Sequence, residues 1–368
     1  MAGHSVPIDF RVNPAKISNP VERKTLLQDL VPVVEPFTGS LTEISVTEVP
    51  GGNFVALYAS DEMTFSVKLY GNGIVSATVE YYTDKVNEHK IVNDDGRRLE
   101  RQLREKFGCT TAKVLPAVKR APLINPYFTS SDDRILEYDV DKVLFEKQSD
   151  FQKVQIIHTL SFGNLLVLDD LQNLAESDLP YTHGLMNKKD EDYEGKEILI
   201  LGGGDGALLW ELLKEKPKFV TMIDIDDVVM ESCRKYMKSV CGDCMDNYDG
   251  PNYKIIVGDA IAYMKDYLEQ NKSFDYVFGD LTDVPISPSP RGELWDFIHN
   301  IINLGTKLLK PGTGKYMTHA IGSGCESALK MFEDQFSTAE VSVSINRTSS
   351  YVPSFMENWC FYQATRKV

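Results

Sequence analysis

The first third of the chain alternates apolar and polar residues like strands, between two stretches with helical spacing. Apolar side chains three and four positions apart predict helices over residues 22–37 and 94–106. Apolar side chains at every second position predict antiparallel strands over residues 54–58, 64–70 and 74–82, with a hairpin turn at Gly71-Asn-Gly73. We therefore expect an α+β domain over residues 1–121.

A proline-rich stretch separates this section from the next one. Pro116 and the prolines of residues 122–126 interrupt both periodicities and mark a boundary. The apolar runs that follow are short and are separated by turns. They predict a β-subdomain over residues 122–180, with strands over residues 135–140, 143–145, 155–158 and 165–168.

Beyond this point, fully apolar runs alternate with helical stretches as far as residue 310. The runs predict buried strands over residues 198–201, 219–223, 253–257 and 276–278. Such alternation predicts a parallel sheet with helices on both faces. We therefore expect residues 181–368 to form a doubly wound, Rossmann-like α/β domain.

Composition narrows the possible partners. A formal net charge of -15 argues against nucleic acid, whose binding needs clustered lysine and arginine. No run reaches the length of a membrane span, and residues 1–18 lack a signal-peptide core, so we expect a cytoplasmic protein without a membrane partner. The six cysteines follow no disulfide rhythm, and Cys241-Gly-Asp-Cys244 lacks the further ligands of a zinc site, so no metal is expected.

The stretch from Glu197 to Gly206, with the sequence Glu-Ile-Leu-Ile-Leu-Gly-Gly-Gly-Asp-Gly, is the strongest chemical signal. Its glycines, Gly202 and Gly204 among them, allow a tight turn and a close approach of a ligand to a helix N-terminus. Such an N-terminus normally receives a phosphate or carboxylate. Asp205 already supplies a negative charge there, so the site should favour a cationic ligand.

Three more acids follow strands of the same predicted sheet. The carboxyl ends of parallel strands meet at one edge, where ligands bind in doubly wound folds. Asp224 lies about twenty residues after the glycine loop, which suits ribose hydroxyls. Asp259, next to Ala260, is placed to read the amino group of adenine. The first three acids therefore suit an adenosine that carries a cation.

The fourth acid, Asp280, is left for the reacting atom. A carboxylate there would pair with a substrate ammonium, orient it and accept its proton. The ordinary pKa values of an amine and a carboxylate differ by roughly six units, but desolvation and a nearby cation narrow that gap. Residues 282–290 are rich in proline and serine and are placed to close over the site.

Other functions fit these residues less well. A NAD-dependent dehydrogenase would bring its pyrophosphate against Asp205, and a methyltransferase would bring the carboxylate of S-adenosylmethionine there. His158 and His183 are possible bases, although an isolated histidine near a strand is usually a packing or hydrogen-bonding residue.

With these residues in view, the chain resembles the aminopropyltransferase (spermidine and spermine synthase) family. The matching strings span about residues 125–365: Phe151-Gln-Lys-Val, Asn173-Leu-Ala-Glu-Ser-Asp-Leu-Pro-Tyr-Thr182, Leu199-Ile-Leu-Gly-Gly-Gly-Asp-Gly206, Asp280-Leu-Thr with Val284-Pro-Ile-Ser287, and Val352-Pro-Ser354 with Glu357 and Trp359. The long N-terminal section is similar to that of the spermine-forming members. There it resembles an S-adenosylmethionine decarboxylase fold without activity and holds two subunits together.

The resemblance implies transfer of an aminopropyl group from decarboxylated S-adenosylmethionine to spermidine, giving spermine and methylthioadenosine. The donor is a co-substrate, and no metal or redox cofactor is implied. It also implies a homodimer through the N-terminal domain, with small molecules as the other partners.

The same resemblance assigns residues. The donor would be held by Gln152, Gly202, Gly204, Asp205, Asp224, Asp259 and Ala260. Asp280 would accept the proton, helped by Tyr181 and Asp205. The acceptor would be held by Gln152, Asp178, Tyr181, Asp205, Asp280, Phe355 and Glu357.

Three departures from the family pattern concern donor affinity and the acceptor. Asp224 stands where a glutamate is common, Phe355 where spermine-forming members have tyrosine, and Asp283 where a neutral residue is usual. The departures leave spermidine or thermospermine as alternative products, and a polyamine-binding regulator without activity as an alternative function.

Overall fold

A computed structural model describes residues 2–84, 88–122, 124–281 and 284–368. The chain divides into two compact units, residues 1–125 and 126–368, each with its own core. None of the helices in the described ranges is both long enough and apolar enough to cross a membrane.

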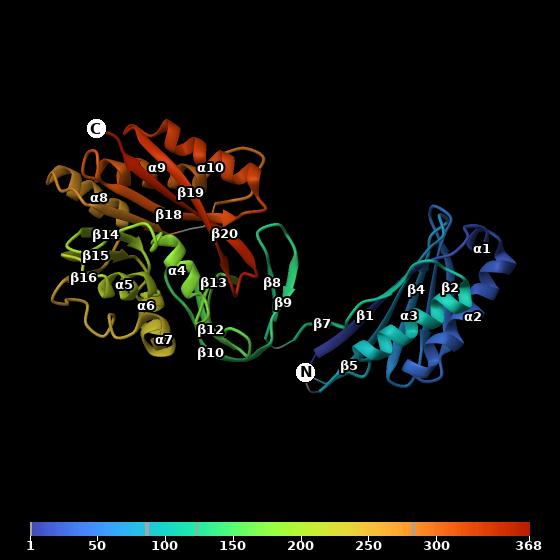
Figure 1. The fold of residues 1–368 in the computed structure, drawn as a ribbon. Helices are drawn as coiled ribbons and strands as arrows, with labels where there is room; N and C mark the ends of the chain where they lie inside the picture. The colour runs from blue at the N-terminus through green and yellow to red at the C-terminus, as the bar shows by residue number, and fades with distance from the viewer. Residues whose placement is uncertain (1, 85–87, 123, 282–283) are drawn as a thin grey trace. The chain divides into compact units, whose positions relative to one another are not determined.

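The first unit is an antiparallel sheet with helices on one face (Figure 1). Its strand order is β2-β3-β4-β5-β1-β6, and β7 also pairs with β1. The strands are β1 (Ala2–Arg11), β2 (Thr42–Val49), β3 (Asn53–Ala59), β4 (Met63–Leu69), β5 (Ile74–Thr83), β6 (Ala112–Val114) and β7 (Val118–Arg120). The helices are α1 (Ala15–Ser18), α2 (Pro20–Thr38) and α3 (Asn93–Phe107). Leu30 of α2 and Leu103 of α3 are fully buried in the same core as alternate residues of the strands.

The predicted helices and the three predicted strands of this unit are confirmed. Strands β1 and β2 were not predicted. Strand β2 lies at the edge of the sheet and nearly all of its residues are exposed, including Ile44 and Val46, which alternate with polar residues. The likeness of this unit to a decarboxylase fold stays a prediction.

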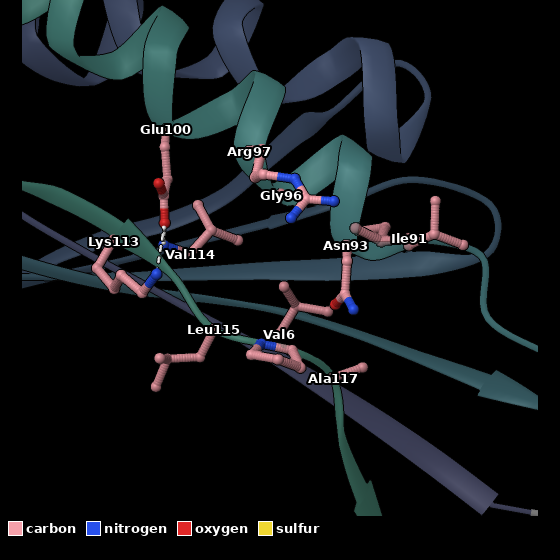
Figure 2. A pocket seen from close by; sticks show the side chains of 12 residues that line it. Val6, Ile91, Asn93, Gly96, Arg97, Glu100, Lys113, Val114, Leu115 and Ala117 are labelled. Carbon is pink, nitrogen blue, oxygen red and sulfur yellow. Dashed lines mark hydrogen bonds and ion pairs between the residues drawn. The ribbon is translucent and has the colours of Figure 1, made fainter.

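A cavity of about 240 Å³ lies between the start of α3 and the β6–β7 segment (Figure 2). Beside it, Glu100 of α3 accepts hydrogen bonds from the Val114 backbone N–H at 2.9 Å and ion-pairs with Lys113 at 3.2 Å. These contacts lower the pKa of Glu100, the backbone hydrogen bond most of all. One carboxylate therefore joins the helix to the last strands of the sheet.

The second unit is built on a sheet with strand order β16-β15-β14-β17-β18-β20-β19. The pairs from β16 to β18 are parallel, and β20 and β19 continue the sheet antiparallel. Its strands are β14 (Glu197–Gly202), β15 (Phe219–Asp224), β16 (Tyr253–Val257), β17 (Tyr276–Asp280), β18 (Lys315–Gly322), β19 (Val343–Val352) and β20 (Glu357–Arg366). The order reverses between β14 and β17, the place where doubly wound sheets bind ligands.

Helices cover both faces of this sheet (Figure 1). One face has α4 (Leu179–Leu185), α5 (Ala207–Lys214), α6 (Asp227–Tyr236) and α7 (Lys238–Cys241). The other has α8 (Ala260–Glu269), α9 (Glu293–Lys307) and α10 (Glu326–Thr338). The doubly wound α/β fold predicted from the alternation of strands and helices is confirmed.

A smaller sheet precedes this one in the chain. Its order is β10-β11-β12-β13, and β8 and β9 form a separate hairpin. The strands are β8 (Tyr127–Thr129), β9 (Ile135–Glu137), β10 (Val140–Gln148), β11 (Lys153–Thr159), β12 (Gly163–Leu168) and β13 (Leu171–Ala175). The prediction of one continuous strand over residues 135–140 is wrong, because β9 ends before Tyr138 and β10 begins only at Val140. Tyr138 is buried, and its backbone N–H donates to the carbonyl of Pro126 at 2.7 Å.

Candidate active site

The glycine loop between β14 and α5 is shaped by its neighbours. At Gly202, where φ is +83°, a β-carbon would lie 2.0 Å from the carbonyl oxygen of Asp280 on the adjacent strand β17. At Gly204, a β-carbon would lie 2.7 Å from a carboxylate oxygen of Asp224. The loop therefore needs these glycines in order to lie against two of the predicted acids.

Asp205 lies in this loop, two residues before the first turn of α5. Its Oδ1 accepts a hydrogen bond from the Ala207 backbone N–H at 2.7 Å. Burial, with a smaller contribution from the negative charge of Asp224, raises the pKa of Asp205 to about 6. The carboxylate is therefore mainly ionised at pH 7 in a site that favours a positive charge beside it.

Asp224 ends β15 and uses both of its carboxylate oxygens. Oδ2 accepts from the Gly204 backbone N–H and Oδ1 from the Asp226 backbone N–H, both at 2.9 Å. Burial raises the pKa of Asp224. These bonds fix the side chain at the carboxyl edge of the sheet, and its contact with a ribose stays a prediction.

Asp259 caps the first turn of α8 at the same edge. Its Oδ1 accepts from the Ile261 backbone N–H at 2.9 Å, and the residue is exposed, while Ala260 is buried. Gln152 donates to Oδ2 of Asp226 at 3.1 Å, which places it near the start of α6. The assignment of Gln152 and Asp259 to the donor stays a prediction.

Asp280 and Tyr181 meet at the end of β17. The Tyr181 hydroxyl, from α4, donates to Oδ1 of Asp280 at 3.0 Å. The Asp280 side chain is only 10% exposed. Two residues predicted to act together are thus in hydrogen-bond contact, in a place sheltered from water.

Sequence reasoning missed His319, which is also beside Asp280. Its Nε2 lies 3.8 Å from Oδ1 of Asp280, and its ring packs on that of Tyr181 at 5.7 Å. Complete burial lowers the pKa of His319 to about 4, so the imidazole is neutral at pH 7. His319 belongs to β18, and only a prediction of that strand next to β17 would have found it.

The two histidines that the sequence singled out lie elsewhere. His158 contacts Asp141 at 2.6 Å and His183 contacts Glu211 at 2.9 Å, each in a local polar pair. They are hydrogen-bonding residues, as expected of isolated histidines near strands.

Aromatic rings surround Tyr181. The rings of Phe361 and Phe355 lie 5.5 and 6.0 Å away, and Phe355 packs edge-on against Trp359 at 4.7 Å. These rings form an aromatic wall that would suit the methylene groups of an aliphatic chain. A second polar cluster surrounds Glu357, which lines the same cavity as Phe355 and Trp359.

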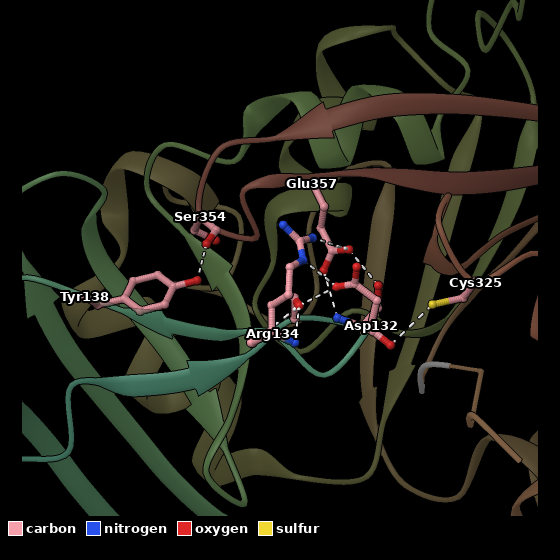
Figure 3. Close-up of polar contacts among 8 residues, drawn as sticks. Asp132, Arg134, Tyr138, Cys325, Ser354 and Glu357 are labelled. Carbon is pink, nitrogen blue, oxygen red and sulfur yellow. Dashed lines mark hydrogen bonds and ion pairs between the residues drawn. The ribbon is translucent and has the colours of Figure 1, made fainter. Parts of the chain in front are cut away.

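Glu357 belongs to that second cluster (Figure 3). Its two oxygens accept from the backbone N–H and the hydroxyl of Ser131, at 3.0 and 2.6 Å. Arg134 lies 4.0 Å away and is also bound to Asp132 at 2.7 Å. The β8–β9 turn therefore fixes Glu357 in place, and the contact of Glu357 with an acceptor stays a prediction.

Asp178, predicted to hold the acceptor, is 1% exposed. Its oxygens accept from the backbone N–H groups of Ala175 and Ser354 at 2.7 and 2.9 Å, and from the Ser354 hydroxyl at 2.5 Å. Burial raises its pKa. These bonds join the start of α4 to the turn before β20, and a contact of Asp178 with an amine stays a prediction.

Exposed apolar side chains at the carboxyl edge were also missed. Ile225 follows β15, Val257 ends β16 and Leu281 follows β17, and these residues are 43%, 46% and 37% exposed. They offer apolar surface to a flat ring between Asp224 and Asp280. The signal was available, because each lies next to one of the predicted acids or its strand.

Two further expectations concern metals and the proposed lid. Within the described ranges, no three His, Cys, Asp or Glu side chains are grouped to hold a metal ion. Cys241 and Cys244 are buried, and burial raises the pKa of both thiols. Asp283, with Thr282 beside it, lies outside the described residues.

Comparisons with known proteins agree with this architecture. Residues 180–368 match the family described as "Spermine/spermidine synthase domain", and residues 127–176 match "Spermidine synthase tetramerisation domain". The chain is 30% identical over 235 residues to the polyamine aminopropyltransferase of Sulfurisphaera tokodaii, covering 62% of this chain and 73% of the relative. It is 32% identical over 154 residues to that of Shigella boydii, covering 41% of this chain and 51% of the relative. It thus spans about half the length of that relative and of several similar ones.

Solved structures show the same fold. A spermidine synthase from Thermotoga maritima matches with a TM-score of 0.52 at 19% identity, covering 65% of this chain and 78% of the other. A spermidine synthase in complex with the transition-state analogue AdoDATO matches with a TM-score of 0.53 at the same identity and coverage. At this identity the likeness concerns the fold alone.

Proposed function

The chain belongs to the spermine/spermidine synthase family, and on that premise we propose that it transfers an aminopropyl group from decarboxylated S-adenosylmethionine to spermidine. The products would be spermine and methylthioadenosine. The observation that carries the proposal is the contact between Tyr181 and Asp280 at the sheet edge that also bears Asp205.

The donor would lie along the glycine loop. Its sulfonium and its free ammonium are both positive, and Asp205 offers a buried carboxylate at that place. Asp224 and Asp259 would hold the ribose and the adenine, and the exposed side chains of Ile225 and Leu281 would contact the ring. S-adenosylmethionine itself has a carboxylate in place of a hydrogen, so repulsion from Asp205 would select the decarboxylated donor.

The chemical step would be a direct displacement. The acceptor nitrogen loses a proton to Asp280, and its lone pair forms a bond to the donor methylene carbon. The carbon–sulfur bond breaks, its electron pair stays on sulfur, and neutral methylthioadenosine leaves. No covalent enzyme intermediate is needed.

Asp280 would do its work as an oriented proton acceptor. The hydroxyl of Tyr181 holds Oδ1 and so fixes the orientation of the carboxylate. Low exposure of Asp280 and His319 excludes water and lowers the cost of bringing an uncharged amine to the carbon. Alignment would supply much of the rate, because a carboxylate is a weak base for an ammonium.

The acceptor chain would run from Asp280 past the aromatic wall of Phe355 and Trp359 to Glu357. An acid, an apolar wall and a second acid would suit a chain whose charged nitrogens are separated by methylene groups. Phe355 contributes a ring without a hydroxyl, so specificity along this path would depend on the acids.

Product analysis tests the proposal. The protein is incubated with decarboxylated S-adenosylmethionine and either putrescine or spermidine, and the amines are separated by chromatography. We expect spermine from spermidine, with methylthioadenosine in equal amount. Spermidine from putrescine, or thermospermine from spermidine, would keep the reaction type and overturn the product. Absence of methylthioadenosine with every amine would favour a polyamine-binding regulator.

A further inference from the structure

A cavity of about 260 Å³ is lined in part by Phe355, whose ring packs against that of Tyr181 at 6.0 Å. Three segments of the second unit line it: the β8–β9 turn, the β12–β13 turn, and the stretch from Phe355 to Trp359. Ile286 and Ile321 complete its apolar part. Phe355, Glu357 and Trp359 of the proposed acceptor path line it.

Acidic side chains from all three segments line this cavity. Glu357 is the inner one, 9% exposed and fixed by Ser131. Asp133 of the β8–β9 turn and Asp170 of the β12–β13 turn are exposed at its rim. We call Asp133 and Asp170 the outer acid pair.

Two residues that line the cavity have buried polar atoms without a hydrogen-bond partner. Trp359 is only 5% exposed, and its indole N–H has no hydrogen-bond acceptor among the described residues. The Gln172 side-chain oxygen is also buried without a donor in the described chain. An unsatisfied buried group costs about 1–3 kcal/mol, and a polar ligand toward which these side chains turn would recover that loss.

Nearby cations do not cancel the outer acid pair. Lys153 approaches Asp170 at 3.5 Å, but the Asp170 side chain is 74% exposed, and such pairs are weak. Arg134 is bound to Asp132, and the Asp133 carboxylate has no hydrogen bond or ion pair within the described ranges, although its backbone N–H donates to the Ser130 carbonyl at 3.1 Å. The rim of the cavity therefore keeps negative charge for a ligand.

We propose that the outer acid pair binds the terminal ammonium of a triamine acceptor, while the central ammonium of the triamine lies between Glu357 and Gln172. This rests on the proposed function and names the residues that would prefer a triamine. A diamine whose one nitrogen is at Asp280 has no third nitrogen to reach the rim. The rings of Phe355 and Trp359 would cover the methylene groups and attract the central cation.

The test is the double variant Asp133→Asn with Asp170→Asn, assayed with spermidine and with putrescine. Asparagine keeps the size of each side chain and removes its charge. We expect the KM for spermidine to rise about tenfold for the pair and about threefold for each single variant, as for partly exposed ion pairs. The kcat with either amine and the KM for putrescine should change less than about twofold. Calorimetry of spermidine binding in the presence of methylthioadenosine should show the same loss without turnover.

A control removes equal charge elsewhere. Asp266→Asn with Glu269→Gln neutralises two exposed acids of α8, and both KM values should stay unchanged. If wild type makes spermine but the double variant keeps the wild-type KM and affinity for spermidine, the binding role of the outer acid pair is refuted while the proposed function stands. If wild type does not use spermidine, the proposed function fails first and the inference with it. A fall in affinity shared equally by putrescine would also overturn the inference, because it would be a general charge effect.

Discussion

At the scale of single residues, Asp205 sets the electrostatic character of the site. A buried carboxylate next to Asp224 is unfavourable in the free protein, which is why its pKa rises to about 6. A sulfonium or ammonium placed beside it reverses the balance. Binding of a cationic donor would therefore stabilise the ionised form of Asp205.

We expect Asp205→Asn to weaken the decarboxylated donor roughly 10- to 100-fold, the range for a hydrogen bond to a charged group. Methylthioadenosine has no ammonium and no sulfonium, so its affinity should change less than about threefold. Titration calorimetry with both ligands measures the difference. Equal losses for the two ligands would contradict this account of Asp205, since asparagine still accepts from Ala207.

The same carboxylate predicts a pH dependence. The folded-state pKa of about 6 lies above the ordinary aspartate value of about 4, so folding favours the protonated form. Its contribution to stability is present at low pH and is lost as pH rises from about 4 through 6. Asp205→Asn should therefore raise the melting temperature at pH 8, with little effect at pH 4.5. The affinity of wild type for the donor should fall below pH 6, where Asp205 becomes protonated. His319→Asn should leave this pH dependence unchanged, because the pKa of His319 is about 4.

Asp280 gives the second residue-scale prediction. Asp280→Asn should lower kcat about 1,000-fold, within the range for general base catalysis, and leave methylthioadenosine affinity within about twofold. Tyr181→Phe removes only the hydrogen bond to Oδ1 and should cost about tenfold. Single-turnover rates measure the change in the chemical step, and calorimetry measures the affinity for methylthioadenosine. Full turnover by Asp280→Asn would remove this residue from the proton-accepting role.

The acids of the site could be found in the sequence because each follows a strand that its apolar run identifies. Asp205, Asp224, Asp259 and Asp280 all lie at the predicted edge. His319 could not be found in this way, because its strand β18 was not predicted. Its closeness to Asp280 depends on the pairing of β17 with β18, which no local pattern encodes.

At the scale of elements, the β8–β9 turn positions a residue far away in sequence. Ser131 binds Glu357 at the start of β20, and Cys325 donates to the Ser131 carbonyl at 3.3 Å (Figure 3). Gly322, at the end of β18, lies next to this contact. A β-carbon there would lie 2.1 Å from the Ser131 hydroxyl and 2.4 Å from a Glu357 oxygen.

We therefore expect Gly322→Ala to push Glu357 away from the turn and to raise the KM for spermidine about tenfold. In the proposed site the donor would lie along the glycine loop instead, so methylthioadenosine affinity should stay unchanged. Gly324→Ala is the matched control, since a β-carbon at Gly324 meets nothing within 4 Å. An unchanged KM in Gly322→Ala would show that the position of Glu357 is unimportant for the acceptor.

Elements with a strong period were predictable, and elements defined by their partners were not. Helix α3 and strands β3, β4 and β5 have clear apolar alternation because one face of each is buried. Strand β2 is exposed almost throughout. Strands β19 and β20 extend the parallel sheet in the antiparallel sense, an arrangement set by the rest of the fold rather than by their own residues.

At the scale of the whole molecule, the first unit has a folded core but none of the predicted site residues. Its sheet is covered by helices on one face only. The other face presents half-buried small and apolar side chains, including Val55, Leu57, Ser66 and Thr78, together with the exposed polar residues Thr64, Lys68 and Glu80. A sheet face of this kind is usually covered by a second layer.

We expect a second copy of the chain to supply that layer, giving a symmetric homodimer through the first unit. In sedimentation velocity, the full chain should behave as a dimer and a chain beginning near residue 122 as a monomer. Leu57→Arg places a charge at the middle of the open face and should give monomers, whereas Glu105→Arg, on the exposed side of α3, should leave the dimer intact. Circular dichroism separates dissociation from unfolding, and Thr78→Arg repeats the test at a polar position. Because the site residues lie in the second unit, a monomeric Leu57→Arg that keeps its fold should also keep methylthioadenosine affinity. A dimer that persists in both the Leu57→Arg and Thr78→Arg variants would show that subunits associate through another surface.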